Sequence, residues 1–309
     1  MTDMKKPAQR RAIPSNSSVA AHRHSIIEAA LAEALIERGV TVPALRADGE
    51  IHRFDAPDKK RGNLSGWYVV PTHEVGVFGF WHTGEQQTVT LRGEYDPIAA
   101  EQARQAAERA RRERQQQRVQ DQARAASRAR ETWLQAGFAL AEHPYLLAKG
   151  VQPHGLKAQG QTLLVPLFFA GKLVNLQRIA ADGAKRFMKG GRIKGAACPV
   201  GRIAGASTVY ICEGWATAAT IHETTGHPVV AAMNAGNLEP VARRLRASLP
   251  DAEIIIAADN DRHTAGNPGY AAAHKAAEAI RAGLTWPRFP CTDCKCSDFN
   301  DLAKCKEAQ

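Results

Sequence analysis

Two short apolar runs, each ending in carboxylates, decide the architecture of the C-terminal half: TVYICEG at 208–214 and EIIIAADND at 253–261. Each run has the length and the β-branched content of a buried strand. Glu213 ends the first run, and Asp259 and Asp261 end the second. An acid directly after a buried strand is expected at the edge of the sheet where the strand ends, because burying its charge more deeply carries a steep desolvation penalty.

Strands and helices alternate around these two runs. This alternation predicts a parallel sheet with both faces covered by helices, and active groups of such sheets gather at the carboxyl ends of the strands. We therefore expect the three acids to lie together. The expected strands are 208–212, 229–232, 253–258 and 284–286, and the expected helices are 214–223, 238–248 and 268–282.

The acids have two interpretations. Taken singly, Asp259 or Asp261 could cap a helix or form a turn. Acids at two strand ends of one αβ unit, in a basic chain, favour a metal site, because the two carboxylates of an Asp-X-Asp turn can share one Mg²⁺.

The rest of the chain shows further changes of pattern. The meander expected at 162–187 has alternating β-type runs, whereas 101–131 is almost entirely Ala, Gln, Arg and Glu. That segment predicts a solvated helical connector, with a nucleic-acid-binding arm as the alternative. The predicted parts are a disordered tail (1–16), an α+β module (17–95), a helical linker (96–131), a basic β-rich subdomain (132–205), the αβ domain (206–303) and a tail (304–309).

Composition favours a polyanionic partner. The chain of 309 residues has 41 Lys and Arg against 31 Asp and Glu, a net charge of +10. No window holds the 18 or so consecutive apolar residues of a membrane helix, and the N-terminus lacks the apolar segment of a secretory signal. The sequence therefore predicts a cytoplasmic protein without a membrane partner.

A basic stretch precedes the αβ domain and could pair template phosphates or nucleotide triphosphates. The alternative is a solvated hairpin. The aromatic residues Trp67, Tyr68, Phe80 and Trp81 could stack on bases, but we expect them to fill the core of a small β module. The basic residues are Arg178, Lys185, Arg186, Lys189, Arg192 and Lys194.

Four cysteines near the C-terminus form a C-x2-C-x-C-x8-C pattern. The first pair has the spacing of zinc ligands, but the close placement of the second and third is unusual for zinc. We therefore expect reduced surface thiols, with zinc as the alternative. Cys212, inside an apolar strand, is expected in the core. The four cysteines are Cys291, Cys294, Cys296 and Cys305.

The acid pattern resembles that of the Toprim domain, and longer strings over about residues 130–303 resemble the Toprim-domain DNA primases of plasmids and phages. The module at 40–95 is similar to the leader of such primases, though less distinctly. The strings are CEGWATAA (212–219), NAGNL (234–238), DFNDL (298–302), HPYL (143–146), KGV (149–151), LQRI (176–179) and KRF (185–187).

The resemblance implies a Toprim Rossmann-like parallel sheet preceded by a small basic β-rich subdomain. It implies Mg²⁺ or Mn²⁺ at Glu213, Asp259 and Asp261, and synthesis of short RNA primers from ribonucleoside triphosphates on a single-stranded DNA template. The zinc ribbon that some such primases carry at the N-terminus has no counterpart in this sequence.

No P-loop motif is present, so we expect a separate replicative helicase as partner. A metal-dependent Toprim nuclease and a non-catalytic DNA-binding module are the alternative functions. The non-catalytic module is disfavoured, because the chain keeps all three acids, Glu213, Asp259 and Asp261.

Overall fold

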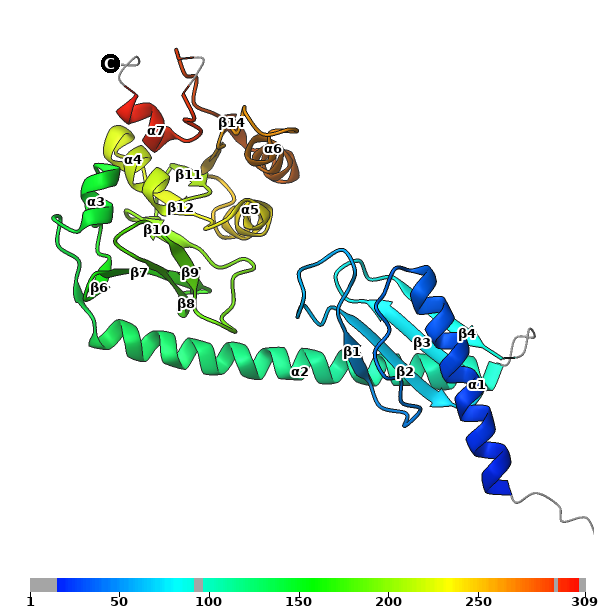
Figure 1. Ribbon diagram of the computed structural model, residues 1–309. Helices are drawn as coiled ribbons and strands as arrows, with labels where there is room; N and C mark the ends of the chain where they lie inside the picture. Colours follow the sequence, from blue (N-terminus) through cyan, green and yellow to red (C-terminus); the bar gives the residue numbers. More distant parts are fainter. Residues whose placement is uncertain (1–15, 92–96, 292–293, 306–309) are drawn as a thin grey trace, which may run out of the picture. The chain divides into compact units, whose positions relative to one another are not determined.

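The computed structural model describes residues 16–91, 97–291 and 294–305 (Figure 1). The chain divides into two compact units at Gln116 and Gln117, and each unit has its own sheets and core. The predicted tail at 1–16, apart from Asn16, lies outside the described residues, as does 306–309 of the predicted C-terminal tail. Of the helices in the described ranges, none is long and apolar enough to cross a membrane.

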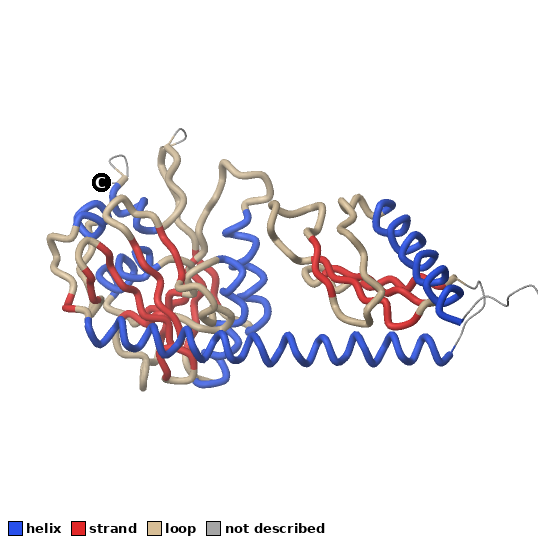
Figure 2. The backbone as a smooth tube through the Cα atoms, turned by 60° about the horizontal axis from the view of Figure 1, so that its bottom comes forward, coloured by secondary structure: helices blue, strands red, loops and turns tan. Residues whose placement is uncertain are grey.

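The first unit is built on an antiparallel sheet with strand order β1-β2-β3-β4. Helix α1 (Asn16–Glu37) covers one face of this sheet (Figure 2). Tyr68 and Phe80 are buried on that face. Trp67 is buried on the other face, and its ring stacks on that of Trp81 at 5.1 Å. Trp67, Tyr68 and Phe80 are core residues, as the sequence predicts, and Trp81 packs against Trp67 while partly buried. The strands are β1 (His52–Phe54), β2 (Gly66–Thr72), β3 (Val75–Phe80) and β4 (Gln86–Thr90).

One long helix, α2 (Pro97–Gln135), continues from the first unit into the second. Within the second unit Ala125 and Ala129 are fully buried, and Arg128 Nη2 donates to the Lys189 carbonyl at 3.1 Å. Small side chains let a helix backbone lie close to its neighbours, so packing does not require large apolar residues. The prediction of a solvated connector is therefore wrong for this part of α2.

The second unit begins with an antiparallel sheet whose strands follow one another in sequence order. The meander of its last three strands was predicted, whereas the two short first strands carry too few residues for a sequence signal. Helix α3 (Pro144–Lys149) begins at His143, whose Nδ1 accepts from the Tyr145 backbone N–H. The strands are β5 (Gly137–Phe138), β6 (Lys157–Gln159), β7 (Thr162–Phe169), β8 (Lys172–Ile179) and β9 (Lys185–Phe187).

The third sheet has the order β10-β12-β11-β13-β14, and its last four strands are parallel. This confirms the predicted parallel sheet and adds an antiparallel edge strand, β10, that was not predicted. Helix α4 lies on one face, and α5 and α6 lie on the other. The elements are β10 (Cys198–Val200), β11 (Thr208–Cys212), α4 (Trp215–Thr225), β12 (Val229–Ala231), α5 (Leu238–Ser248), β13 (Glu253–Ala257), α6 (Pro268–Ile280), β14 (Gly283–Thr285) and α7 (Phe299–Lys304).

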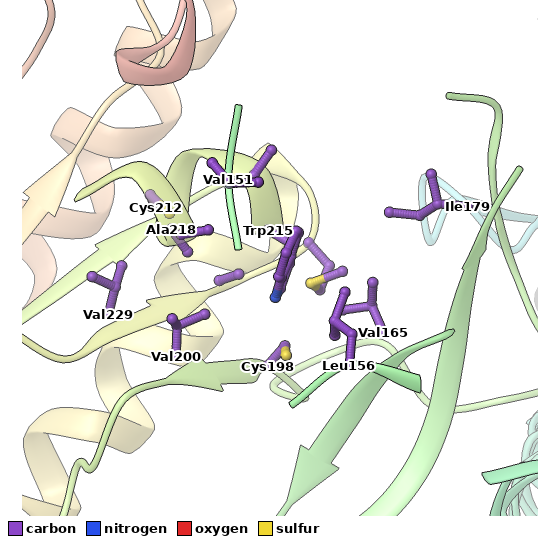
Figure 3. Close-up of a cluster of buried hydrophobic side chains, with 14 of the residues drawn as sticks. Val151, Leu156, Val165, Ile179, Cys198, Val200, Cys212, Trp215, Ala218 and Val229 are labelled. Atoms are coloured by element: carbon purple, nitrogen blue, oxygen red, sulfur yellow. The ribbon is translucent and has the colours of Figure 1, made fainter. Parts of the chain in front are cut away.

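Trp215, the first residue of α4, lies in the core that joins the two sheets of this unit (Figure 3). It packs in one cluster with Val165 of the antiparallel sheet and with Cys212 of the parallel sheet. Because Trp215 is only 2% exposed, its truncation to alanine should cost roughly 3–5 kcal/mol. The predicted basic subdomain and the predicted αβ domain thus share one core, which fixes their side chains relative to each other.

Candidate active site

The predicted acids meet at one edge of the parallel sheet. Strands β11 and β13 are neighbours, and Cys212 lies opposite Ala257 in their register. Glu213 and Asp259 therefore leave adjacent strand ends in the same direction, and Asp261 follows after one residue. The sequence placed the acids at strand ends, and the strand order places those ends side by side.

The surroundings of Asp259 disfavour the charged form of its carboxyl group. Burial, together with the carboxylates of Glu213, Asp298 and Asp261, raises its pKa to about 8. Its Oδ1 atom is buried and has no hydrogen-bond partner among the residues that the structure describes. A buried carboxylate oxygen with no donor, surrounded by other carboxylates, is suited to a cation.

Glu213 lies in a similar environment. Burial is the largest cause that raises its pKa, and the nearby Asp261 carboxylate adds to it. A hydrogen bond from the Ala235 backbone and the positive charge of Lys185 act in the opposite direction. The loop after β12 is tied to this strand end, because the Met233 backbone N–H donates to the Glu213 carbonyl at 2.7 Å.

Asp261 is held in place by the start of α6. Its Oδ2 atom accepts from the Gly269 backbone N–H at 2.9 Å. A Cβ atom on Gly269 would lie 2.7 Å from that oxygen and 3.0 Å from the Cβ of Asp259. Glycine is therefore required at 269 for the helix to approach both acids.

A fourth acid, Asp298, joins the group from the loop before α7. It raises the pKa of both Asp259 and Glu213, and its Oδ2 accepts from Thr217 Oγ1 at 3.1 Å. Its Oδ1 caps α7 by accepting from the Asp301 backbone N–H at 2.8 Å. We did not assign Asp298 to the site from sequence, although the DFNDL string that begins with it was a signal.

The asparagines of the primase-like strings connect separate segments. Asn237 donates to the carbonyls of Ala196 and Ala232 at 2.8 and 2.7 Å. Asn300 donates to the Lys149 carbonyl at 2.7 Å and to Thr220 Oγ1 at 2.9 Å. Both side chains are buried, and buried amides need such partners. Their role is to hold the loops that carry the acids.

Lys185 is the predicted basic residue that faces the acids. Much of its side chain is exposed, yet desolvation around the ammonium and the charge of Lys149 lower its pKa. Asp298, Glu213 and Asp259 oppose that shift, which places Lys185 within their field. A lysine there can neutralise phosphate charge next to the acids.

The other predicted basic residues lie elsewhere on the antiparallel sheet. Arg178 and Arg186 are cross-strand neighbours on β8 and β9, and both are exposed. Arg192 and Lys194 lie in the loop after β9, where Arg192 stacks on Phe169. Lys189 is exposed, and its backbone carbonyl accepts from α2.

The C-terminal cysteines are not the reduced surface thiols that we expected. Cys291 and Cys294 form a disulfide, and the buried Cys305 Sγ lies 3.7 Å from Cys291 Sγ. Arg262 Nη2 donates to Cys294 Sγ at 3.0 Å. Cys296 is partly exposed. The expectation of surface thiols was wrong because the loop before α7 folds back over the residue that follows Asp261.

The acids do not yet form a chelating set. Among the residues that the structure describes, no three His, Cys, Asp or Glu side chains converge closely enough to hold one ion. The fit to a cation rests instead on the unpartnered Asp259 Oδ1 and on the like charges around it. Rotation of the acid side chains would have to complete the coordination.

Comparison with known proteins agrees with this geometry. Residues 208–308 match the family model of the Toprim domain, so the C-terminal third of the chain is a Toprim domain. The expected fold class is confirmed by this match and by the parallel sheet at the same residues.

Two Escherichia coli proteins named DNA primase TraC are similar to the chain. The first is 38% identical over 257 residues, a match that covers 78% of this chain and 18% of that protein. The second is 38% identical over 259 residues, covering 78% of this chain and 24% of that protein. The predicted resemblance to Toprim-domain primases is thereby confirmed.

The chain therefore spans less than a quarter of the length of these relatives, 18% of the first and 24% of the second. A solved structure of the DnaG catalytic core is also similar, at 11% identity and a TM-score of 0.38, covering 56% of this chain and 71% of that one.

Proposed function

We propose that this chain is a metal-dependent primase that synthesises short RNA primers on single-stranded DNA. The observation that carries the proposal is the group of Glu213, Asp259, Asp261 and Asp298, with the buried and unpartnered Asp259 Oδ1 at its centre. Carboxylates gathered at one sheet edge are the usual means of binding the metal ions of phosphoryl transfer. The relatives named as DNA primases support the choice among Toprim activities.

In this proposal Glu213, Asp259 and Asp261 hold Mg²⁺ or Mn²⁺, and Asp298 lies beside them. Such an ion stabilises the charge that develops on the phosphates and favours deprotonation of the attacking hydroxyl. Lys185 orients the triphosphate by pairing with its negative charge. Thr217 keeps Asp298 turned towards the acids through its hydroxyl.

The basic residues of the antiparallel sheet bind the template in the same proposal. Phosphate contacts position a strand without reading its bases. Arg178 and Arg186 present two exposed guanidinium groups side by side on β8 and β9. The proposal also includes the predicted domain boundaries, a separate replicative helicase, a plasmid or phage setting and a cytoplasmic location.

Primer synthesis from labelled ribonucleotides on single-stranded DNA tests the proposal. We expect short, ribonuclease-sensitive products that require both the template and Mg²⁺ or Mn²⁺. Cleavage of the template without added nucleotides would establish the nuclease instead. DNA binding with no metal-dependent chemistry would establish the non-catalytic module.

The cysteine group allows zinc as an alternative to the disulfide. The 3.7 Å between the Cys291 and Cys305 sulfur atoms is close to the roughly 3.8 Å that separates two thiolates on one tetrahedral zinc. Elemental analysis of the protein purified under reducing conditions, combined with a count of reactive thiols, separates the two states. One zinc per chain with protected thiols would support zinc, and titratable thiols without zinc would exclude it.

A further inference from the structure

The turn that carries Asp259 and Asp261 is held by the loop between β14 and α7, residues 286–298, which we call the cysteine loop. The Asn260 backbone N–H donates to the Ser297 carbonyl at 2.6 Å. Its side-chain Nδ2 donates to the Pro287 carbonyl at 3.2 Å. Because Asn260 lies between the two acids in sequence, the position of both acids depends on the cysteine loop.

Arg262, the residue after Asp261, contacts both cysteines of the disulfide in this loop. Its Nη1 donates to the Cys291 carbonyl at 2.7 Å. Its Nη2 donates to the Cys294 carbonyl at 3.1 Å and to Cys294 Sγ at 3.0 Å. The guanidinium carbon also lies 5.0 Å from the centre of the Phe289 ring. One side chain therefore joins the acid-bearing turn to the disulfide.

The Cys291–Cys294 disulfide keeps the acceptors of Arg262 together. It closes a short ring over residues 291–294, so two carbonyls and one sulfur atom converge on the same guanidinium group. A planar guanidinium group has its donors in fixed directions and binds best where the acceptors are fixed too. Reduction of the disulfide gives the ring residues back their conformational freedom. The disulfide therefore preorganises the cysteine loop for Arg262.

The cysteine loop also carries the fourth acid, Asp298. The preceding residue, Ser297, accepts from the Asn260 backbone N–H and donates its own N–H to Asp301 Oδ2 at 3.0 Å. Asp298 lies close enough to Asp259 to raise the pKa of that carboxyl group. A displacement of the loop would therefore move Asp298 together with the turn that carries the other acids.

The disulfide can be reduced from outside. Cys294 is partly exposed, whereas Cys291 is buried, so the thiolate of a dithiol would attack Cys294 Sγ and release the Cys291 thiolate. The second thiolate of the dithiol then displaces Cys294, and the dithiol becomes a cyclic disulfide. The two protons of the dithiol pass to the two cysteines. Disulfides in a reducing compartment are usually transient and redox-sensing.

We propose that Arg262 is a positioning residue of the active site and that the Cys291–Cys294 disulfide controls how firmly it holds the acids. In the oxidised chain Arg262 fixes the cysteine loop against the turn at 259–261. In the reduced chain this hold is weaker, and primer synthesis falls. The inference rests on the proposed function only for the reaction that is controlled.

The test compares the oxidised full chain with the same protein treated with dithiothreitol, in primer synthesis and in backbone hydrogen exchange measured by mass spectrometry. We expect reduction to lower primer synthesis roughly tenfold, because the acids lose their fixed positions. Exchange should rise in peptides that cover 259–263 and 294–298, but not in peptides from 52–90 of the first unit. Re-oxidation should restore both measurements.

Variants separate the arginine from the disulfide. Arg262→Ala should lower primer synthesis about tenfold in the oxidised chain and remove most of the response to dithiothreitol. Arg262→Lys keeps the charge but loses the planar group, so it should be intermediate. The matched control is Arg288→Ala, an exposed arginine of the same loop beside Trp286, which should behave as the wild type. The Cys291→Ser, Cys294→Ser double variant should resemble the reduced wild type.

The proposal is overturned if the oxidised and reduced wild type make primers at the same rate and exchange alike at 259–263. It is also overturned if the reduced protein holds one zinc ion in place of free thiols, because zinc would then fix the loop without the disulfide. Circular dichroism checks that each variant folds. Reduction of the wild type and Arg262→Lys test the proposal even where Arg262→Ala does not fold.

The exchange measurement is independent of the proposed function. A rise in exchange at 259–263 on reduction, in a chain that makes no primers, would support the redox control and refute the primase. Primer synthesis at equal rates in both redox states, with equal exchange, would support the primase and refute the redox control.

Discussion

Alternate residues of the turn at 259–262 have contrasting surroundings. Asp259 lies among other carboxylates, including that of Asp261, and burial together with these charges raises its pKa to about 8. Asn260 and Arg262 instead donate hydrogen bonds to carbonyl oxygens of the cysteine loop. The comparison teaches that the acids are suited to a metal ion, whereas their sequence neighbours hold the turn in place although the acids repel one another.

The largest expected effect comes from removing the central acid. Asp259→Asn keeps the shape but removes the charge, and should lower primer synthesis on the order of 10³-fold. Single-stranded DNA binding in EDTA should change little, because the basic residues of the antiparallel sheet are untouched. The matched control is Asp251→Asn, an exposed acid before the same strand. Equal activity in Asp259→Asn and the wild type would remove the acids from the mechanism.

A second effect tests the close approach of α6 to the acids. Gly269→Ala adds a Cβ atom 2.7 Å from Asp261 Oδ2, so the helix or the acids must shift. We expect primer synthesis to fall roughly 10- to 100-fold, because displacement of about 1 Å is enough to impair catalysis. Gly137→Ala is the control, since its Cβ would meet no atom within 4 Å. Rates that are the same in both variants would show that the acids tolerate the displacement.

A third effect concerns pH and metal removal. The pKa of Asp259 is about 8 in the folded chain and near 3.8 when unfolded, so folding takes up a proton between these values. Stability of the EDTA-treated protein should therefore fall as pH rises from about 4 to 8, lowering the melting temperature by roughly 7–14 °C between pH 5 and pH 8.

Two comparisons isolate the contribution of this carboxyl group. Asp259→Asn should lack that part of the decline, and Mg²⁺ should restore stability to the wild type at pH 8. Parallel curves for the wild type and the variant, measured by differential scanning calorimetry, would contradict the assignment of the raised pKa to Asp259.

The smallest effect is expected from the disulfide beside Arg262. It closes only a short ring over residues 291–294, so in the chain-entropy model it contributes about 2 kcal/mol to stability. Reduction should therefore lower the melting temperature of the wild type by roughly 4–8 °C. The Cys291→Ser, Cys294→Ser double variant should show no such change. An equal shift in both proteins, measured by differential scanning calorimetry, would show that the dithiol acts at another site.

Much of the Toprim domain could be predicted from local patterns. Apolar runs such as 208–212 and 253–257 and the helices between them are short-range features, because a buried strand must be apolar along its length. The carboxylates that follow these runs could also be recognised from the sequence, because they end an apolar run. The aromatic core of the first unit also followed, since Trp67 and Tyr68 alternate faces of one strand.

Other features depend on contacts between segments that are distant in sequence. The edge strand β10 has three residues, and its pairing with β12 depends on a distant segment. The sequence around Asp298 is typical of a helix cap. Only the packing of α7 against α4 places Asp298 beside Asp259. Ala125 and Ala129 give no apolar stripe, yet they bury part of α2.

The sequence by itself determined the αβ order of the Toprim domain and the placement of Glu213, Asp259 and Asp261 at strand ends, because periodicity and desolvation act over a few residues. The tertiary structure alone decided which charges meet. It set Asp298 among the acids and brought the cysteine loop to the Arg262 guanidinium group from a separate segment. Charges interact through space, and distances through space depend on the packing of distant segments and not on their spacing in the chain.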